Sequence, residues 1–246
     1  MLSKRIFYIN SRNRISGTDC DFNINIDMGP NPKFNRICAQ TVIIPKSYYL
    51  VQAGFNTFTL TENKATTITI PAGNYSSSSF IAIIPVLLNL ASISLGNTWT
   101  YNMFFPSRSD PGTGKFTFIV TGNGGLQPSF TFYNNLFEQF GFPKSSTTTF
   151  FGDKMISTNI IKFQLEDTIF VHSSLCTNGR DDILEMVSAS GADLSTMTHE
   201  AGDIMAASKI ITTHSPSARF SLTDEDGNAL DLNGLNWILK LLVWEQ

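Results

Sequence analysis

Charged residues are scarce in this sequence of 246 residues, at 15% of the total, and the formal net charge is only −3. Such a balance offers no electrostatic basis for sequence-independent binding to nucleic acid, which depends on clustered Lys and Arg. Hydrophobic residues make up 42% of the chain, enough to bury a substantial core. We therefore expect a folded protein that binds no specific nucleic acid.

Cysteine is also rare: Cys20, Cys38 and Cys176 lie far apart, without CxxC spacing. An odd number of widely spaced cysteines indicates reduced, buried thiols. The N-terminal segment carries charges where a signal peptide needs an apolar run, so we expect no secretion signal. The most apolar stretch, residues 80–95, covers about 16 residues and contains Pro85, which predicts a buried helix and no membrane span.

Motifs for catalysis or metal binding are missing. The three histidines form neither HxH nor HExxH, and no GxSxG occurs. His172 and Cys176 are four residues apart on a strand without a third orienting group, and His172 is interpreted as a satisfied core or interface residue. Asp224, Asp226 and Asn228 alternate as in a calcium loop, but the glycine and glutamate of that loop are out of place, and the turn is expected to be exposed. We predict no enzyme, no catalytic residue, no metal and no cofactor.

Period-two alternation is the strongest structural signal. Residues 21–27 alternate apolar side chains with Asn23 and Asn25, and segments 56–60 and 66–70 alternate around a polar turn. Some ten such segments, with few helices and no regular succession of strand and helix, predict antiparallel sheets packed face to face. The predicted fold class is all-β, a single jelly-roll β-sandwich of antiparallel strands with one or two short helices.

Proline and glycine mark where these strands end. Pro45 and Pro71 cannot donate a backbone hydrogen bond, so each is expected at a strand end, bulge or sheet edge. Gly73 is predicted to take a positive φ in the turn after Pro71. Gly141 is expected to end a short helix, and Gly227 lies in a predicted hairpin turn.

One longer helix follows the second proline. The serine run at 76–79 supplies N-cap candidates for a helix that extends to about Ala91. Pro85 would either kink this helix or delay its start. No repeat and no linker rich in Pro, Gly or Ser divides the chain. We therefore predict an N-terminal arm or edge strand at residues 1–15 and a single jelly-roll domain at residues 16–246.

Several short motifs occur in an informative order. They are Asn-Ser-Arg (10–12), Asp-Phe-Asn-Ile (21–24), Ile-Pro-Lys-Ser-Tyr-Tyr (44–49), Asn-Thr-Phe (56–58), Ile-Pro-Ala-Gly-Asn-Tyr (70–75), Phe-Gly-Phe (140–142) and Asp-Glu-Asp-Gly-Asn-Ala-Leu-Asp-Leu-Asn-Gly (224–234). In this order they resemble the penton, or minor capsid, proteins of virophages, Polinton-like viruses and related large double-stranded DNA viruses. The resemblance covers nearly the whole chain, and it departs from the usual pattern at Phe140, where leucine is common, and at Pro85.

The resemblance implies a structural capsid protein that folds as a jelly roll and forms pentamers at the five-fold vertices of an icosahedral double-stranded DNA virus capsid. The implied partners are four further copies of the chain, a major capsid protein of double jelly-roll type and other minor capsid proteins. The implied location is the capsid vertex of the virion, after assembly in the cytoplasm of the infected host cell.

Candidate interface residues follow from charge and strand pattern. The sequence offers basic side chains near the N-terminus and uncharged polar strand faces, namely Arg5, Arg12, Arg14, Asn23, Asn25, Thr67 and Thr69. Uncharged faces can meet a neighbour without burying unpaired ions. The basic side chains could equally serve solubility alone.

A second hypothesis is a jelly-roll module that binds carbohydrate or a receptor, as a lectin or a fibre does. Tyr48, Tyr49 and Tyr75 lie beside prolines at strand ends, and exposed aromatic rings there could stack on sugar rings. The oligomeric state discriminates between the hypotheses, because a pentamer favours the vertex and a trimer favours a fibre or lectin.

Overall fold

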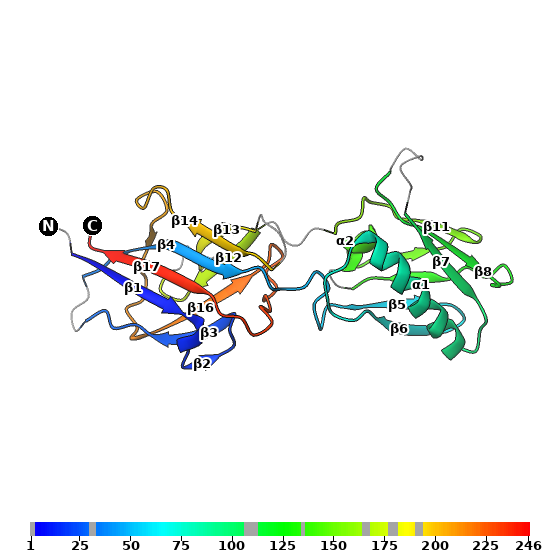
Figure 1. Cartoon of the computed structure of the whole chain (residues 1–246), viewed down its shortest axis with the longest axis horizontal. Coiled ribbons are helices and arrows are strands. Elements are labelled where there is room, and N and C mark those ends of the chain that lie inside the picture. The colour runs from blue at the N-terminus through cyan, green and yellow to red at the C-terminus, as the bar shows by residue number, and fades with distance from the viewer. Residues whose placement is uncertain are drawn as a thin grey trace. The chain divides into compact units, whose positions relative to one another are not determined.

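The computed structural model describes residues 3–29, 33–105, 113–133, 136–163, 168–176, 182–189 and 194–246. Two compact units divide the chain (Figure 1). The jelly-roll unit consists of Met1–Tyr48 and Leu165–Gln246, and the inserted unit is Tyr49–Gln164. The sequence predicts one domain over residues 16–246, whereas in the structure a second β unit interrupts that range.

The jelly-roll unit takes its name from its strand pairing. Its longer strands are β1 (Lys4–Asn10), β3 (Asp21–Asn25), β4 (Arg36–Pro45), β12 (Thr168–Ser173), β13 (Ile183–Ser188), β14 (Thr196–Glu200), β16 (Ser217–Thr223) and β17 (Ile238–Trp244). One sheet has the order β1-β17-β4-β14 and the other β13-β12-β16-β3. Counted along the chain, the first of these strands pairs with the last, the second with the seventh, the third with the sixth and the fourth with the fifth, all antiparallel. This nested pairing confirms the predicted jelly roll.

Three short elements complete the jelly-roll unit. They are the 3₁₀ helix η1 (Ser11–Asn13), β2 (Ser16–Gly17) beside β3, and β15 (Lys209–Ile210) beside β4. Residues 4–10, predicted as an arm or an edge strand, form the edge strand β1, which pairs with β17 over its whole length. The unit's interior is apolar on both sheets, and Phe22 of β3 meets Trp237 with ring centroids 5.7 Å apart.

The inserted unit contains two further antiparallel sheets and two helices. The sheets are β10-β9-β5-β6 and β11-β8-β7, from β5 (Thr57–Thr61), β6 (Ala65–Thr69), β7 (Thr100–Phe104), β8 (Thr117–Thr121), β9 (Ser129–Thr131), β10 (Thr147–Thr149) and β11 (Lys154–Ile156), with helices α1 (Ser77–Ser94) and α2 (Leu136–Phe140). Aromatic rings fill the space between the two sheets and the helices. The ring centroid of Phe130 lies 5.5 Å from that of Phe58 and 5.4 Å from that of Phe118. Much of the phenylalanine-rich composition is thus used in one core.

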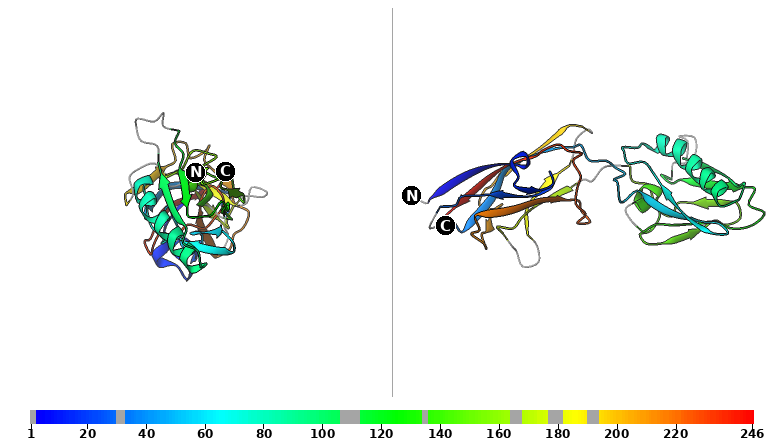
Figure 2. Two further views of the ribbon diagram at one scale, coloured as in Figure 1. Left: turned by 90° about the vertical axis from the view of Figure 1, so that its right-hand side faces the viewer. Right: turned by 90° about the horizontal axis from the view of Figure 1, so that it is seen from below.

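Helix α1 lies along one side of the inserted unit (Figure 2). It begins with the predicted serine cap, since the side chains of Ser76 and Ser79 each bind the other's backbone N–H. The helix starts before Pro85 and continues beyond it, so this proline does not delay its start.

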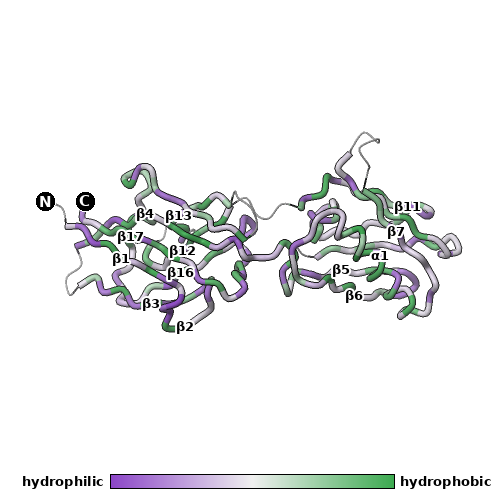
Figure 3. The backbone as a smooth tube through the Cα atoms, viewed as in Figure 1, coloured by the Kyte–Doolittle hydropathy of each residue, from purple (hydrophilic) through white to green (hydrophobic). Residues whose placement is uncertain are grey.

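Only one face of α1 is buried, which corrects the prediction of a buried helix. The buried face repeats every four residues, at Phe80, Ile84, Leu88 and Ser92, while apolar side chains on the other face are more than half exposed. The helix contains no charged residue, and green and white prevail along it in Figure 3. By length and composition alone it could cross a membrane, but its buried face is packed into the core of the inserted unit.

Candidate subunit interface

Five of the seven candidate interface residues lie on one side of the jelly-roll unit. Arg5 belongs to β1, Arg12 and Arg14 to η1 and the residue after it, and Asn23 and Asn25 to β3. Strand β1 is an edge of one sheet, and β3 with the short β2 forms an edge of the other. Arg5 Nη2 lies 3.9 Å from Asp27 Oδ2, and this ion pair joins the two edges. We call this surface the β1–β3 side.

Strand β1 is an open sheet edge. Just beyond its ends, Ser11 N–H donates to Trp237 O, and Glu245 N–H donates to Ser3 O. The odd-numbered residues therefore bond to β17, and the N–H and C=O groups of even-numbered residues point away from it, where the described residues place no further strand. Ile6 and Tyr8, which are 43% and 73% exposed, lie along this edge. Unpaired backbone groups beside exposed apolar side chains are typical of a surface that another chain covers.

The three arginines of this side differ in their contacts. Arg5 Cζ lies 5.4 Å from the ring centre of Phe7, and the guanidinium also pairs with Asp27. Arg14 Nη1 donates to Ser11 O at 3.0 Å, which fixes it against η1. Arg12 is exposed, like Lys4 at the other end of β1. Exposed ion pairs contribute at most about 1 kcal/mol to stability, so these charges matter more for partners than for the fold.

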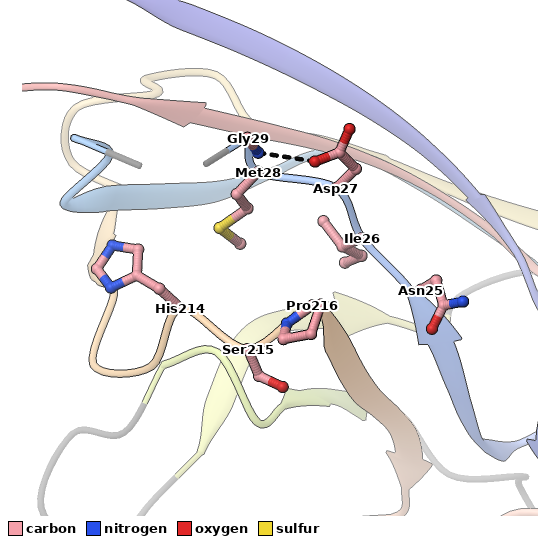
Figure 4. A pocket seen from close by; sticks show the side chains of 8 residues that line it. All are labelled: Asn25, Ile26, Asp27, Met28, Gly29, His214, Ser215 and Pro216. Atoms are coloured by element: carbon pink, nitrogen blue, oxygen red, sulfur yellow. Dashed lines mark hydrogen bonds between the residues drawn. The ribbon is translucent and has the colours of Figure 1, made fainter. Parts of the chain in front are cut away.

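A hollow of about 480 Å³ opens beside Asn25 (Figure 4). Residues 25–29 form one wall and residues 214–216 the other. Ile26 and Met28 contribute buried apolar surface, and the Ile26 N–H donates to Pro216 O across it at 2.8 Å. The hollow is large enough to accept an apolar side chain. Asp27 is the one acidic residue among those that line it.

The opposite side of the same unit is formed by β13 and β14, the other edges of the two sheets. His199 Nε2 of β14 lies 3.7 Å from Glu185 Oε2 of β13, which joins these edges. Asp182 and Glu200 add exposed carboxylates, and Met186 is 57% exposed. We call this surface the β13–β14 side. The sequence did not predict it, because residues 182–189 are ambiguous between strand and helix and residues 191–207 resemble a loop with at most a short strand.

Thr67 and Thr69, the remaining candidates, lie on β6 in the inserted unit. These two residues belong to a larger threonine-rich face of the sheet. The strand register places four threonines in one row across four strands, namely Thr147, Thr131, Thr59 and Thr67. The hydroxyl oxygens of Thr131 and Thr147 are 2.8 Å apart. The face is uncharged, as predicted, and its use in an interface stays a prediction.

The predicted turn residues hold with one exception. Pro45 ends β4, Gly141 and Gly227 take φ values of 71° and 81°, and Pro71 follows β6. Gly73 was expected to have positive φ, and that prediction is wrong.

Gly73 is instead part of an isolated antiparallel bridge. Its N–H donates to Val51 O at 3.0 Å and its O accepts from Val51 N–H at 3.1 Å. The turn is fixed by Asn74, whose side-chain oxygen accepts the Leu50 N–H at 2.9 Å. Because a side chain supplies this contact, the backbone needs no left-handed residue.

Asp224 is buried, contrary to the expectation of an exposed turn. Its Oδ1 accepts the N–H groups of Asp226 and Asn228 at 3.0 and 2.7 Å, and its Oδ2 accepts from the Asn228 side chain at 2.9 Å. Both carboxylate oxygens are therefore engaged in shaping the hairpin around Gly227.

Neither the histidine of β12 nor the cysteines form a nucleophilic pair. His172 lies 2.7 Å from Asp182 Oδ1 through Nδ1 and 2.9 Å from Thr223 Oγ1 through Nε2. The three cysteines are buried and unpaired, as predicted. Burial raises the pKa of the Cys176 thiol to about 11, so it stays protonated near neutral pH.

The tyrosines named for sugar stacking do not form an exposed cluster. Tyr48 is fully buried, and Tyr75 packs edge-on against Phe80 and donates its hydroxyl to Pro71 O at 2.7 Å. Tyr49 is 36% exposed. This removes the observation that favoured carbohydrate binding.

Similarity to known proteins was found among solved structures. No family model matches the chain, and no curated protein matches it. Among solved structures, the chain is similar to the penton protein of mavirus, whose selenomethionine-labelled form was crystallised, with a TM-score of 0.46 and 13% identity. The alignment covers 100% of this chain and 99% of that chain.

Proposed function

We propose that the chain is a structural, penton-like capsid protein that forms pentamers at the five-fold vertices of an icosahedral double-stranded DNA virus capsid. The observation that carries the proposal is the position of the motifs that resemble penton proteins. Two of them bind each other, and a third binds the residues that follow the last motif, where the jelly roll closes.

The first contact joins the two ends of the jelly roll. Ser11, in the Asn-Ser-Arg motif, is buried, and its Oγ accepts the Trp237 N–H at 3.1 Å. The same Oγ lies 3.2 Å from Asn236 Oδ1, to which it donates. This motif therefore fixes the first strand against the segment that enters the last one.

The second contact joins the motif at 44–49 to the motif at 224–234. Ser47 Oγ donates to Leu232 O at 2.7 Å, and the Asn233 side chain donates to Ser47 O. Buried hydrogen bonds of this kind each contribute about 1 kcal/mol and fix a unique geometry. Motifs far apart in the sequence thus share a structural role, which supports a resemblance in fold and assembly and suggests no shared catalytic site.

In this proposal the partners are four further copies of the chain, surrounded by a major capsid protein of double jelly-roll type and other minor capsid proteins. The protein would reside at the vertex of the virion after assembly in the cytoplasm of the infected cell. Its role is structural and requires no cofactor.

Sedimentation velocity of the purified chain over a micromolar concentration range tests this function, because interfaces of one size range from micromolar to picomolar affinity. We expect a monomer–pentamer equilibrium, and negative-stain images of the large species should show five-fold rings. A monomer throughout, or a trimer, would overturn the proposal, and the trimer would favour the fibre or lectin hypothesis.

A further inference from the structure

We propose that the β1–β3 side of one copy binds the β13–β14 side of the next copy, so that the jelly-roll units associate head to tail. This inference rests on the proposed pentamer and identifies its contact surfaces. A closed ring with five-fold symmetry uses heterologous contacts, in which each subunit presents two different and complementary surfaces.

Topology places the two surfaces on opposite sides of one unit. Strands β1 and β14 are the outer strands of one sheet, while β13 and β3 with β2 are the outer strands of the other. The Arg5–Asp27 pair joins one set of edges, and the His199–Glu185 pair joins the other. Because the sides are opposite, a subunit can contact two neighbours at once.

The charges of the two sides are opposite in sign. The segment of β1 and η1 carries Lys4, Arg5, Arg12 and Arg14 and has no acid between residues 3 and 14. Three acids lie elsewhere on this side. Asp27 pairs with Arg5, Asp21 is bound by the guanidinium of Arg219, and Asp19, in the turn between β2 and β3, is half-buried.

The β13–β14 side carries Asp182, Glu185 and Glu200, and Lys209 of β15 is a half-buried base there. Opposite potentials across a contact favour the correct pairing and disfavour others.

Charge also argues against pairing of two β1 edges. An antiparallel β1–β1 contact would place Lys4 and Arg5 of each copy near Arg12 and Arg14 of the other. Like charges placed opposite one another destabilise such a pair. The basic residues at both ends of β1 therefore permit an acidic neighbour and disfavour a two-fold dimer.

Apolar groups complement the charges on both sides. Ile6 and Tyr8 are exposed at the open edge of β1, and Ile26 and Met28 line the hollow beside Asn25 of β3. On the opposite side, Met186 of β13 is exposed. Each side therefore combines exposed apolar surface with an excess of one sign of exposed charge, as interfaces with an apolar centre and a polar rim do.

Charge reversal tests the inference. Variant A combines Lys4→Glu and Arg12→Glu, and variant B combines Ser188→Lys and Glu200→Lys; all four side chains are exposed. Variant AB carries all four changes. The control for A is Lys64→Glu with Lys154→Glu, and the control for B is Thr98→Lys with Glu225→Lys. All four positions are exposed, none belongs to β1, η1, β2, β3, β13 or β14, and each control makes the same change in charge as its variant.

We expect A and B each to raise the midpoint concentration of pentamer formation at least about tenfold in sedimentation velocity. Both controls should stay within about twofold of the unmodified chain, and AB should recover most of the loss. At 1 M salt, where the screening length is about 3 Å, the difference between A and the unmodified chain should shrink. Circular dichroism establishes that every variant is folded.

Two results would overturn the inference while leaving the proposed pentamer intact. In one, A and B form pentamers as readily as their controls. In the other, both are weakened but AB is weaker still, so that the two sides do not face each other. If the unmodified chain forms no pentamer, the proposed function fails first, and the inference fails with it.

Discussion

Replacement of Gly141 by alanine should destabilise the inserted unit more than the same change at any other glycine we compare. Gly141 follows α2 with a φ of 71°, and an added Cβ would lie 2.5 Å from Asn159 O and 3.0 Å from Ser157 Cβ. Its own backbone is held on both sides, because its N–H donates to Glu138 O and its O accepts the Asn159 N–H at 2.8 Å. The chain cannot move away without breaking these bonds.

The magnitude has two parts. A left-handed backbone costs a residue with a side chain about 1 kcal/mol. A heavy-atom contact of 2.5 Å forces neighbouring atoms to shift, and overpacking of this kind typically costs about 1–3 kcal/mol. We therefore expect Gly141→Ala to lower the free energy of unfolding of the inserted unit by about 2–4 kcal/mol.

Two other glycines of the inserted unit separate these parts. Gly96 has a φ of 83° and no atom within 4 Å of the added Cβ, so Gly96→Ala should cost only the backbone part, about 1 kcal/mol. Gly73 lacks a positive φ, and the nearest atom would be 3.8 Å away, so Gly73→Ala should be neutral or stabilise by up to about 1 kcal/mol.

Hydrogen exchange at increasing urea, measured by mass spectrometry in peptides from residues 49–164, reports the free energy of unfolding for this unit. The expected order of destabilisation is Gly141, then Gly96, then Gly73. If Gly141→Ala costs no more than Gly96→Ala, the close contact with Asn159 O does not exist in solution, and the argument is refuted.

Three further predictions follow from buried or paired groups. Asp224→Ala should destabilise the jelly-roll unit by about 2–3 kcal/mol in urea denaturation, because it removes the acceptor of two N–H groups, whereas an exposed control, Glu225→Ala, should change little. The thiols of Cys20, Cys38 and Cys176, whose pKa burial raises to about 12, 11 and 11, should react with Ellman's reagent at pH 8 only after unfolding, and fast reaction of the native protein would contradict this. The hydrogen bonds of Arg219 lower the pKa of Asp21. The stability that this pair adds is therefore present above the ordinary pKa of 3.8 and is lost as pH falls through the lowered value. Arg219→Ala should abolish that part of the acid dependence of unfolding, an effect below about 1 kcal/mol because the pair is exposed.

Local patterns in the sequence predicted local structure well. The alternation at residues 21–27 corresponds to β3, which ends at Asn25; Phe22 and Ile26 are buried and Asn25 is exposed. The serine run became a capping box at Ser76 and Ser79. These signals depend on neighbours within a few residues, so no knowledge of tertiary contacts is needed to interpret them.

Several predictions about single residues failed because they depended on long-range contacts. Gly73 was assigned to a left-handed turn because the sequence does not show that Val51 bridges it. Tyr48 and Asp224 were expected near the surface because each lies three residues from a proline or glycine, which favour turns. Both are nevertheless buried in the jelly-roll unit.

Of the two sides of the candidate interface, only the basic β1–β3 side could be predicted from the sequence. Arg5, Arg12 and Arg14 are clustered in the sequence, so their charge is visible without a structure. The acids of the opposite side come from β13 and β14, which are brought together only by the fold of the two sheets. Complementarity between the two sides is therefore a property of the jelly roll and could not be inferred from either segment alone.

The inserted unit was missed because the segment that leads into it does not resemble a linker. Lys46, the residue after β4, is buried and donates from Nζ to Ala189 O at 2.9 Å. Ser47 donates to Leu232 O, and Tyr48 has no exposed surface. Linkers between domains are usually exposed and rich in Pro, Gly or polar residues, because few contacts cross them. Here the chain is fixed in the jelly-roll unit up to the residue before the insertion begins. A connection that is itself part of a core must carry the composition of a core, and for that reason composition alone did not reveal the boundary.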